Sequence, residues 1–240
     1  MTTAFVDCNN LCYRAYHTTG TLSYGNNLTG VAYGFLNQLF TFLKKAPYGV
    51  QPVFCWDSKT NYRRGVYGGY KKREEQTEEA AQRRSELYDQ FDAIRTEMIP
   101  ALGWVNRCWH IEGYEADDLM AVGCEKSSEK VCIIVSGDED LYQCLFNKSG
   151  VETMIFNPGK NEFYRQADFF GEYNISEEYW PQVKALAGEL PATLGVPISR
   201  LSTADIAREV RRAGSVATIS DKSVWRWLHD DAIRPWQHRA

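Results

Sequence analysis

The sequence predicts an α/β fold in which a mainly parallel sheet is flanked by helices. Three apolar runs of the kind that form buried strands occupy 4–6, 52–56 and 131–135, and segments with helical periodicity separate them. Each run ends on an acidic residue or shortly before one. Strands that alternate with helices favour parallel pairing, and pockets in such sheets lie at the carboxyl ends of the strands.

Length and composition indicate one large domain, or a main domain with a smaller appendage. The chain has 240 residues, of which 44% are hydrophobic, and a formal net charge of −4. It contains no apolar run of about 20 residues and no charged leader with a cleavage site, so we expect no membrane partner and a cytoplasmic location. Seven scattered cysteines, none in a Cys-x-x-Cys pair, favour reduced thiols over disulfides or zinc.

Two helices and one basic segment lie between the first and third runs. Residues 30–45 carry apolar side chains at helical spacing after Thr29, a candidate cap. Residues 58–73 contain six basic residues and no acid, with three tyrosines interleaved, which suits a phosphate backbone and exposed bases. A solvated loop is the ordinary alternative. A long helix is then predicted over 74–99, with an apolar stripe only in its second half.

Acidic side chains gather at the predicted carboxyl edge of the sheet. Asp7 ends the first run, Asp57 the second, and Asp138 with Asp140 follows the third. The segment 112–119 is also acidic and opens an apolar helix, in which Glu115 and Asp118 share one face and Asp117 can reach the same pocket. Taken alone, the segment 112–119 is explained equally well by ordinary helix-start chemistry, and each single aspartate is explained better by a turn or a helix cap. Their joint position at three strand ends indicates a site.

Such a cluster requires a cation, because ionised carboxylates a few ångström apart raise one another's pKa. Ligands that are all oxygen select a hard divalent ion, so the sequence predicts Mg²⁺, with Mn²⁺ as a substitute. Ions of this kind commonly act on phosphates. The net negative charge does not exclude nucleic acid, because the acids and the bases occupy different segments.

Several motifs carry a resemblance to a known family. They are Phe5–Asp7 with Arg14–His17, Leu28–Gly34, Phe54–Asp57, Tyr70–Arg73, Glu115–Asp118 and Ser136–Asp140. In order and spacing the sequence resembles the flap endonuclease / 5′-3′ exonuclease family, which includes the 5′ nuclease domain of bacterial DNA polymerase I and the bacteriophage flap endonucleases. The resemblance covers most of the chain.

The resemblance implies a PIN-like 5′ nuclease fold. Residues 1–180 would form the nuclease domain, with a helical arch at about 59–99, and residues 181–240 a small helical hairpin-type region that binds duplex DNA. The implied activity is divalent-metal-dependent, structure-specific hydrolysis of DNA phosphodiester bonds in replication or repair. Substrates would be DNA with a 5′ flap, a 5′ end or a branch, and the RNA of RNA–DNA hybrids is a further reading. A monomer in a bacterial or phage-infected cell is expected.

Roles for individual residues also come from the resemblance. The first metal would be held by Asp7, Asp57, Glu115, Asp117 and Asp118, and the second by Asp138 and Asp140, with Glu189 as a further carboxylate. Lys71 and Arg73 would contact the scissile phosphate or steer the 5′ strand, and Arg14 would support the site. The DNA-binding residues would be Arg63, Arg64, Tyr70, Lys72, Arg200, Arg208, Arg211 and Arg212.

Two departures from the family pattern bear on function. Where the family has Gly-Asp-x-x-Asp, this chain has Gly188-Glu189-Leu190-Pro191-Ala192, and Ala192 has no ligand atom. The hairpin segment 195–204 lacks two glycines of the family motif. We therefore expect its backbone to approach phosphate or K⁺ less closely than the family motif does. These departures leave an alternative open, namely a protein that binds DNA junctions or flaps with weak or no catalysis.

Overall fold

The computed structural model describes residues 2–60, 62, 77–146, 150–173, 208 and 212. The chain divides into two compact units. The first contains Met1–Asp138 and Cys144–Phe163, and the second contains Glu139–Gln143 and Tyr164–Ala240. The boundary that the sequence predicts near residue 180 lies outside the described residues.

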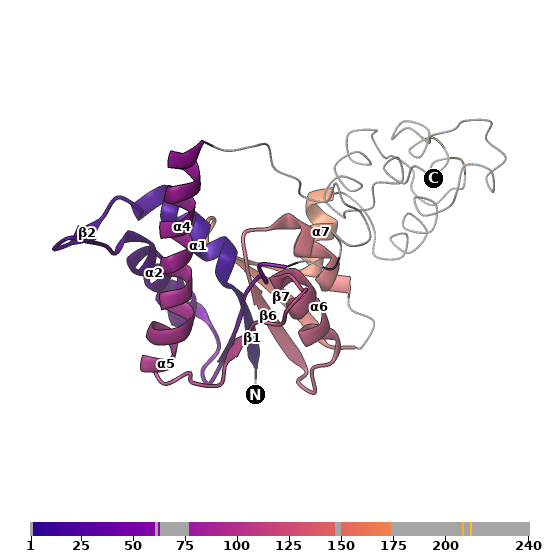
Figure 1. Cartoon of the computed structure of the whole chain (residues 1–240). Helices are drawn as coiled ribbons and strands as arrows, with labels where there is room; N and C mark the ends of the chain where they lie inside the picture. The colour runs from indigo at the N-terminus through magenta and orange to yellow at the C-terminus, as the bar shows by residue number, and fades with distance from the viewer. Residues whose placement is uncertain are drawn as a thin grey trace. The chain divides into compact units, whose positions relative to one another are not determined.

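A six-stranded sheet with the order β5-β4-β1-β6-β7-β8 forms the centre of the first unit. The strands are β1 (Thr3–Asp7), β4 (Gln51–Cys55), β5 (Cys108–Trp109), β6 (Val131–Val135), β7 (Glu152–Asn157) and β8 (Glu162–Tyr164). The pairs β1–β4, β1–β6, β4–β5 and β6–β7 are all parallel. The three strands predicted from sequence are therefore β1, β4 and β6, which lie side by side, as Figure 1 shows for β1 and β6.

Successive side chains of β1 point to opposite faces of the sheet. Ala4 and Val6 belong to the main core cluster, together with residues of three helices on one face of the sheet. Phe5 points to the other face, where Gly123 lies against its ring. Both faces are thus covered, which explains why residues 4–6 of β1 and all of β6 are apolar rather than alternating with polar residues.

Three helices cover the first face: α1 (Cys8–Thr19), α2 (Gly30–Lys45) and α4 (Glu78–Ala93). Helices α1 and α2 pack closely at Gly34, where an added Cβ would come within 2.7 Å of the Ala15 Cβ. Thr29 occupies the N-cap position of α2, as predicted, although its side chain makes no capping hydrogen bond. Between α1 and α2 lies a short hairpin of β2 (Ser23–Tyr24) and β3 (Asn27–Leu28). Figure 1 shows these helices on one side of the sheet.

The long helix predicted over 74–99 consists of several pieces. The described part begins with α4 at Glu78, continues as the π-helix η1 (Ile94–Met98), and ends with α5 (Ile99–Ala101). The predicted apolar stripe faces the core, because Leu87, Phe91 and Ile94 are buried and Met98 is partly buried against the core cluster. The π-turn changes the helical phase, and this brings Ile99 as well as Ile94 into the core. Residues 63–76 are outside the described part.

Helix α6 (Ala116–Glu125) covers the opposite face. It packs tightly, because an added Cβ at Gly123 would stand 2.7 Å from the Phe5 Cζ. None of the described helices is long and apolar enough to cross a membrane. All seven cysteines are free, and all except Cys108 are buried, in agreement with the predicted reduced thiols.

The described part of the second unit is held by aromatic rings. The 3-10 helix η2 (Glu139–Phe146) begins in this unit, and α7 (Gln166–Tyr173) lies wholly within it. The Tyr142 and Tyr164 rings stack with centroids 4.5 Å apart, and Phe169 meets Tyr142 edge to face. These rings fix the start of η2 against α7.

Candidate acidic active site

We call the carboxyl edge of the sheet that carries Asp7, Asp57 and Asp117 the acidic edge. Asp7 lies at its centre, where β1 ends and α1 begins. Its side chain caps α1 by accepting a hydrogen bond from the Asn10 backbone N–H at 3.0 Å. Its other oxygen accepts a bond of 2.7 Å from the Ser136 hydroxyl, which follows β6. Because Asp7 is only 4% exposed, these two donors replace the water that an aspartate normally binds.

The pKa of Asp7 is raised to about 7, mainly because burial penalises the charged form. The negative charges of Asp117 and Asp57 raise it further, and the hydrogen bonds from Asn10 and Ser136 oppose the shift. The carboxylates that follow β4 and that begin α6 therefore both act on the carboxylate at the end of β1, at one edge of the sheet. The sequence predicted this convergence of Asp7, Asp57 and Asp117.

Asp57 joins the end of β4 to the first turn of α6. Its Oδ1 accepts a hydrogen bond of 2.8 Å from the Ala116 N–H, at the positive end of that helix. Its own N–H donates to the Asn9 Oδ1 at 3.0 Å. Asp57 is thus held by α1 through Asn9 and by α6 through Ala116. Its carboxylate caps α6 and also acts on the charge of Asp7.

Glu115 and Asp118 form a capping box at the start of α6. Glu115 is the N-cap residue and only 8% exposed, and its N–H donates to the Asp118 Oδ2 at 3.1 Å. The helix-start reading of this segment is therefore confirmed for these two residues. The capping box does not exclude a metal role, because a carboxylate oxygen can accept more than one interaction.

The segment after Asp57 is fastened to the loop that precedes Glu115. The Ser58 N–H donates to the Tyr114 carbonyl at 3.0 Å, and the Gly113 N–H donates to the Ser58 Oγ at 3.1 Å. The Tyr62 N–H donates to the Gly113 carbonyl at 3.1 Å. Gly113 has φ of +87°, a conformation that glycine adopts without strain. These bonds fix the distance between two acidic segments that are far apart in sequence.

Asn9, Asn10 and Ser136 are site residues that were not predicted from the sequence. Asn9 receives the N–H of Asp57 on one side of β1, while the Asn10 Oδ1 receives the N–H of Gly137 at 3.1 Å on the other. Ser136, fully buried, donates to Asp7 and accepts from the Asp138 N–H at 3.1 Å. Their only sequence signal is position, since each is a polar residue next to the end of a buried strand.

The donor set fits a hard divalent cation. All the candidate ligands are carboxylates, and a cation would compensate the charges of Asp117 and Asp57, which add to the effect of burial in raising the pKa of Asp7. Within the described ranges, however, no three acidic, histidine or cysteine side chains stand close enough to hold a metal by themselves.

The remaining predicted residues fall into four groups. Arg14 is exposed on α1, with its guanidinium against Gly159 in the turn between β7 and β8. Asp140 belongs to the second unit, where its carbonyl accepts a bond of 2.9 Å from the Gln143 side chain. Arg208 and Arg212 are exposed helical residues. The other predicted residues lie outside the described ranges: Arg63, Arg64, Tyr70, Lys71, Lys72, Arg73, Glu189, Arg200 and Arg211.

Similar sequences point to one family. Residues 2–179 match the model of the 5′-3′ exonuclease, N-terminal resolvase-like domain. The 5′-3′ exonuclease of Halalkalibacterium halodurans is 32% identical over 199 residues, which cover 77% of this chain and 61% of the relative. Thermostable DNA polymerase I of Thermus aquaticus is 30% identical over 203 residues, which cover 80% of this chain and 22% of the polymerase. The chain thus spans about three fifths of the exonuclease and about a fifth of the polymerase.

Solved structures agree on the fold. A bacteriophage T5 protein co-crystallised with metal ions superposes with a TM-score of 0.61 at 17% identity, over 96% of this chain and 85% of the other. A bacteriophage T5 flap endonuclease in a complex with DNA and metal ions gives 0.54 at 15% identity, over 96% and 89%. Together with the match over residues 2–179, the parallel sheet and its acidic edge lead to one conclusion: this chain belongs to the 5′-3′ exonuclease family.

Proposed function

We propose that this chain is a divalent-metal-dependent 5′ nuclease that hydrolyses phosphodiester bonds in DNA with a 5′ end, flap or branch. The observation that carries the proposal is the electrostatic coupling of Asp7 to Asp57 and Asp117, at the carboxyl edge of a sheet in a 5′-3′ exonuclease family member. Solved relatives are described with divalent metal ions and with DNA, which supports the same assignment here.

The acidic edge would hold the cation through Asp7, Asp57 and Asp117, with Glu115 and Asp118 beside them. A bound divalent ion supplies positive charge for the phosphoryl oxygens and activates water for attack. The chain's own contribution is to fix the carboxylates. Asn9 orients Asp57, and Ser136 orients Asp7 and keeps part of its ionised form. We assign the ion as Mg²⁺, with Mn²⁺ able to replace it.

The other residue roles expected from the sequence also belong to this proposal. Asp138, Asp140 and Glu189 would serve a second metal, and Lys71 and Arg73 the scissile phosphate, with Arg14 in support. The basic residues of 63–73 and 200–212 would bind the DNA backbone. A monomer in the cytoplasm of a bacterial or phage-infected cell completes the proposal. Cleavage of the RNA in a hybrid would be read by the same assay with a labelled RNA–DNA hybrid in place of the DNA.

The rival function is a DNA-junction binding protein with weak or no catalysis. One observation favours it, since Ala192 stands where the family pattern has an aspartate, which removes a ligand from the second metal site. A protein with this function would still bind DNA through the basic segments and would still carry the acidic edge, but it would cut DNA slowly or not at all. Binding and cleavage must therefore be measured separately.

The test is cleavage of a 5′-flap DNA labelled at both ends, with Mg²⁺ and then Mn²⁺. We expect metal-dependent cleavage by the unmodified chain, and a loss of at least about a hundredfold in Asp117→Asn with DNA binding within a few-fold. Asp89→Asn makes the same change on the exposed surface of α4 and should cut like the unmodified chain. Tight binding without cleavage under either ion would favour the junction-binding function, and normal cleavage by Asp117→Asn would remove the site assignment.

A further inference from the structure

Cys124 and Cys132 lie on either side of the short connection between α6 and β6. Cys124 is in the last turn of α6, and Cys132 is near the start of β6. Both side chains are buried, at 1% and 0% exposed. The chemistry proposed for the acidic edge uses neither thiol, so the proposed function leaves this pair unexplained.

The alternation of side chains along β6 turns Cys132 toward α6. Its neighbours Ile133 and Val135 belong to the core cluster on the α1 side of the sheet, and Cys132 does not. Cys132 therefore shares the opposite face with Ile134. Cys124 is one of the buried residues of α6, which covers that face. The two cysteines thus lie in the same layer, between α6 and the sheet.

The two sulfurs interact. A hydrogen bond between them raises the pKa of Cys124 and lowers the pKa of Cys132 to about 7. Burial opposes the shift at Cys132, and the Ser127 side chain favours it. Thr153 of β7 pairs with Cys132 in the sheet, and its side chain also acts on Cys124. Cys132 is therefore the thiolate of the pair, and Cys124 is the thiol.

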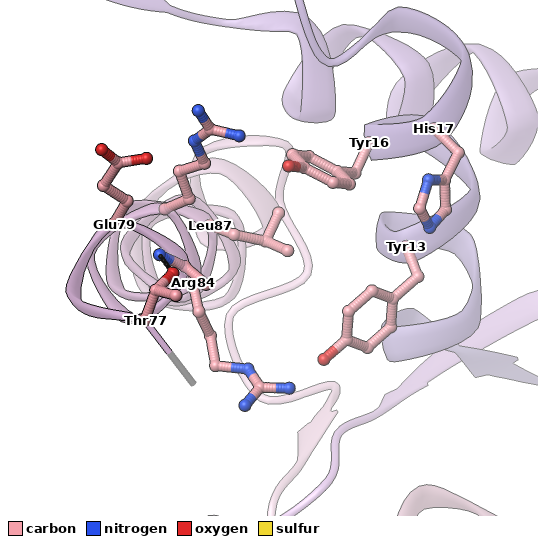
Figure 2. Close-up of a pocket in the computed structure, with 9 residues that line it drawn as sticks. Tyr13, Tyr16, His17, Thr77, Glu79, Arg84 and Leu87 are labelled. Carbon is pink, nitrogen blue, oxygen red and sulfur yellow. Dashed lines mark hydrogen bonds between the residues drawn. The ribbon is translucent and has the colours of Figure 1, made fainter. Parts of the chain in front are cut away.

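The buried cysteines of α1 have a different environment. Burial raises the pKa of Cys8 and of Cys12 well above the ordinary value of a thiol, so both remain protonated. A cavity of about 340 Å³ lies on this side of the sheet, between α1 and the start of α4 (Figure 2). Tyr13 is part of its wall, but none of the described residues that line it is a cysteine. The cavity therefore gives a small solute no direct path to Cys12.

The cover over Cys132 is the connection 126–130. Lys126, Ser128 and Lys130 are exposed, and Ser127, which acts on Cys132, is half-buried. The connection contains no apolar residue. Segments with few buried apolar contacts open locally at low cost, so a small oxidant can reach the sulfur beneath this one.

A thiolate beside a thiol is the arrangement that reacts with peroxides and then closes a disulfide. We propose that Cys124 and Cys132 form a redox-active pair, which a hydroperoxide oxidises to a disulfide that links α6 to β6. The reduced pair is the resting state, as in other proteins whose disulfides are transient. This inference goes beyond the proposed nuclease function and does not depend on it.

The reaction has two steps. The Cys132 thiolate attacks the terminal peroxide oxygen, the O–O bond breaks, and Cys132 becomes a sulfenic acid as hydroxide or alkoxide leaves. The Cys124 sulfur then attacks the Cys132 sulfur, the S–S bond forms, and the S–O bond breaks. Water leaves with the proton of Cys124. The two sulfurs together lose two electrons, which the peroxide gains, and a dithiol reductant reverses the change.

The test treats the full reduced chain with hydrogen peroxide, blocks the remaining thiols with N-ethylmaleimide in urea, and maps unreduced tryptic peptides by mass spectrometry. Trypsin cuts after Lys126 and Lys130, so a disulfide between Cys124 and Cys132 joins two peptides that are otherwise separate. Each of these peptides carries a second cysteine, so fragment ions assign the link. We expect the link between Cys124 and Cys132 as the main product, and dithiothreitol should remove it.

Thermal unfolding gives a second readout on the unmodified chain. The melting temperature of the oxidised chain should exceed that of the reduced chain by about 5 °C, because closing a short loop restricts the unfolded state. Cys12→Ser is the matched control, since it replaces an equally buried cysteine on the other face of the sheet. It should form the link and show the same difference between oxidised and reduced samples.

Two substitutions test the order of the steps. Cys124→Ser keeps a hydroxyl beside Cys132 but cannot form the disulfide, so Cys132 should accumulate as sulfenic and then sulfinic acid. Dimedone labelling and mass spectrometry measure both products. In Cys132→Ser, Cys124 should remain a thiol under the same treatment. Oxidation of Cys124 in that variant, as fast as Cys132 is oxidised in the other, would overturn the assigned order.

The unmodified chain decides the proposal even if a variant fails to fold. A main product that joins Cys124 or Cys132 to Cys108 or Cys144 would overturn it. The proposal would also be rejected if the folded chain formed no link at a peroxide concentration that oxidises the cysteines of the urea-unfolded chain. Cross-linking at equal yield in the folded and the unfolded chain would likewise reject it, because the fold would then contribute nothing.

Discussion

Asp57 and Ala116 join two acidic segments through one hydrogen bond of 2.8 Å, from the Ala116 N–H to the Asp57 Oδ1. The bond gives Asp57 two separable functions. Its oxygen completes the first turn of α6, and its charge contributes to the acidic edge. Substitutions that keep the oxygen but remove the charge can separate these functions.

We expect Asp57→Asn to lose nearly all cleavage and to keep nearly all stability, because the amide oxygen still accepts the Ala116 N–H. Asp57→Ala removes the acceptor as well, and its free energy of unfolding should fall by about 1 kcal/mol more. Urea unfolding and a flap-cleavage assay measure the two effects. If both variants lose the same stability, the hydrogen bond to Ala116 does not stabilise the fold.

The stability of the metal-free protein should depend on pH through Asp7. Its pKa is 3.8 in the reference state and about 7 in the folded protein. Between these values the folded protein retains a proton that the unfolded chain has released, so the free energy of unfolding falls as pH rises. Three pKa units correspond to a fall of about 4 kcal/mol at most, complete above about pH 7 and absent below the reference pKa.

Urea unfolding in EDTA at about pH 5 and about pH 8 checks this expectation. Asp7→Asn should be more stable than the unmodified protein at the higher pH and should lack most of the fall, because no charge forms. Added Mg²⁺ should stabilise the unmodified protein at the higher pH, since a cation compensates the charge. An identical pH dependence in both proteins would mean that Asp7 titrates near its ordinary pKa.

Ser136→Ala should change the pH profile of cleavage as well as stability. The Ser136 hydroxyl lowers the pKa of Asp7, so its loss should move the acidic limb of the profile to higher pH. The variant also leaves the Asp138 N–H without its acceptor, at a cost of about 1 to 3 kcal/mol. Ser85→Ala on exposed α4 is the control. A lower rate with an unmoved profile would assign Ser136 a purely structural role.

Gly34→Ala should destabilise the first unit by about 1 to 3 kcal/mol, because the added methyl group collides with Ala15 where α1 crosses α2. Gly171→Ala in α7 is the matched change, since nothing lies within 4 Å of an added Cβ there. It should be neutral or stabilising by up to about 1 kcal/mol. Thermal unfolding followed by circular dichroism compares the two. Equal effects would show that α1 and α2 can move apart without cost.

Ala192 should limit the second metal site, a prediction that comes from sequence alone. Because Ala192 cannot coordinate, Mn²⁺ should support faster cleavage than Mg²⁺, which demands near-ideal octahedral geometry. Ala192→Asp combined with Glu189→Asp should raise the rate with Mg²⁺ at fixed substrate. Initial rates under both ions test this. Titration calorimetry that found two tight Mg²⁺ ions in the unmodified chain would contradict it.

Much of the fold followed from a simple pattern, because strands buried on both faces have no polar interruption. This made 4–6, 52–56 and 131–135 visible, and the acids after them predicted the site. The strand β7 also carries an apolar run, Met154 to Phe156, but it was not among the predicted strands. The π-turn after α4 leaves no pattern of its own, since Ile94 and Met98 fit an α-helix equally well in sequence.

The supporting residues were harder to predict for a physical reason. Carboxylates at strand ends are conspicuous because clustered charge is costly, whereas Asn9 and Asn10 are neutral and suit any turn. Their function depends on which strands neighbour β1, and only the sheet order β4-β1-β6 reveals that Asn9 reaches one neighbour and Asn10 the other.

The central position of β1 also has a consequence for synthesis of the chain. β1 is made first, yet one of its neighbours is β6, and the bond between Asp7 and Ser136 spans 129 positions. A nascent chain that stops before β6 leaves one edge of β1 unpaired and Asp7 without Ser136. Long-range parallel pairing of this kind is slow, and exposed strand edges favour aggregation. A nascent fragment that ends before β6 should therefore lack the assembled acidic edge, and the proposed nuclease site can form only after Val131–Val135 have been made.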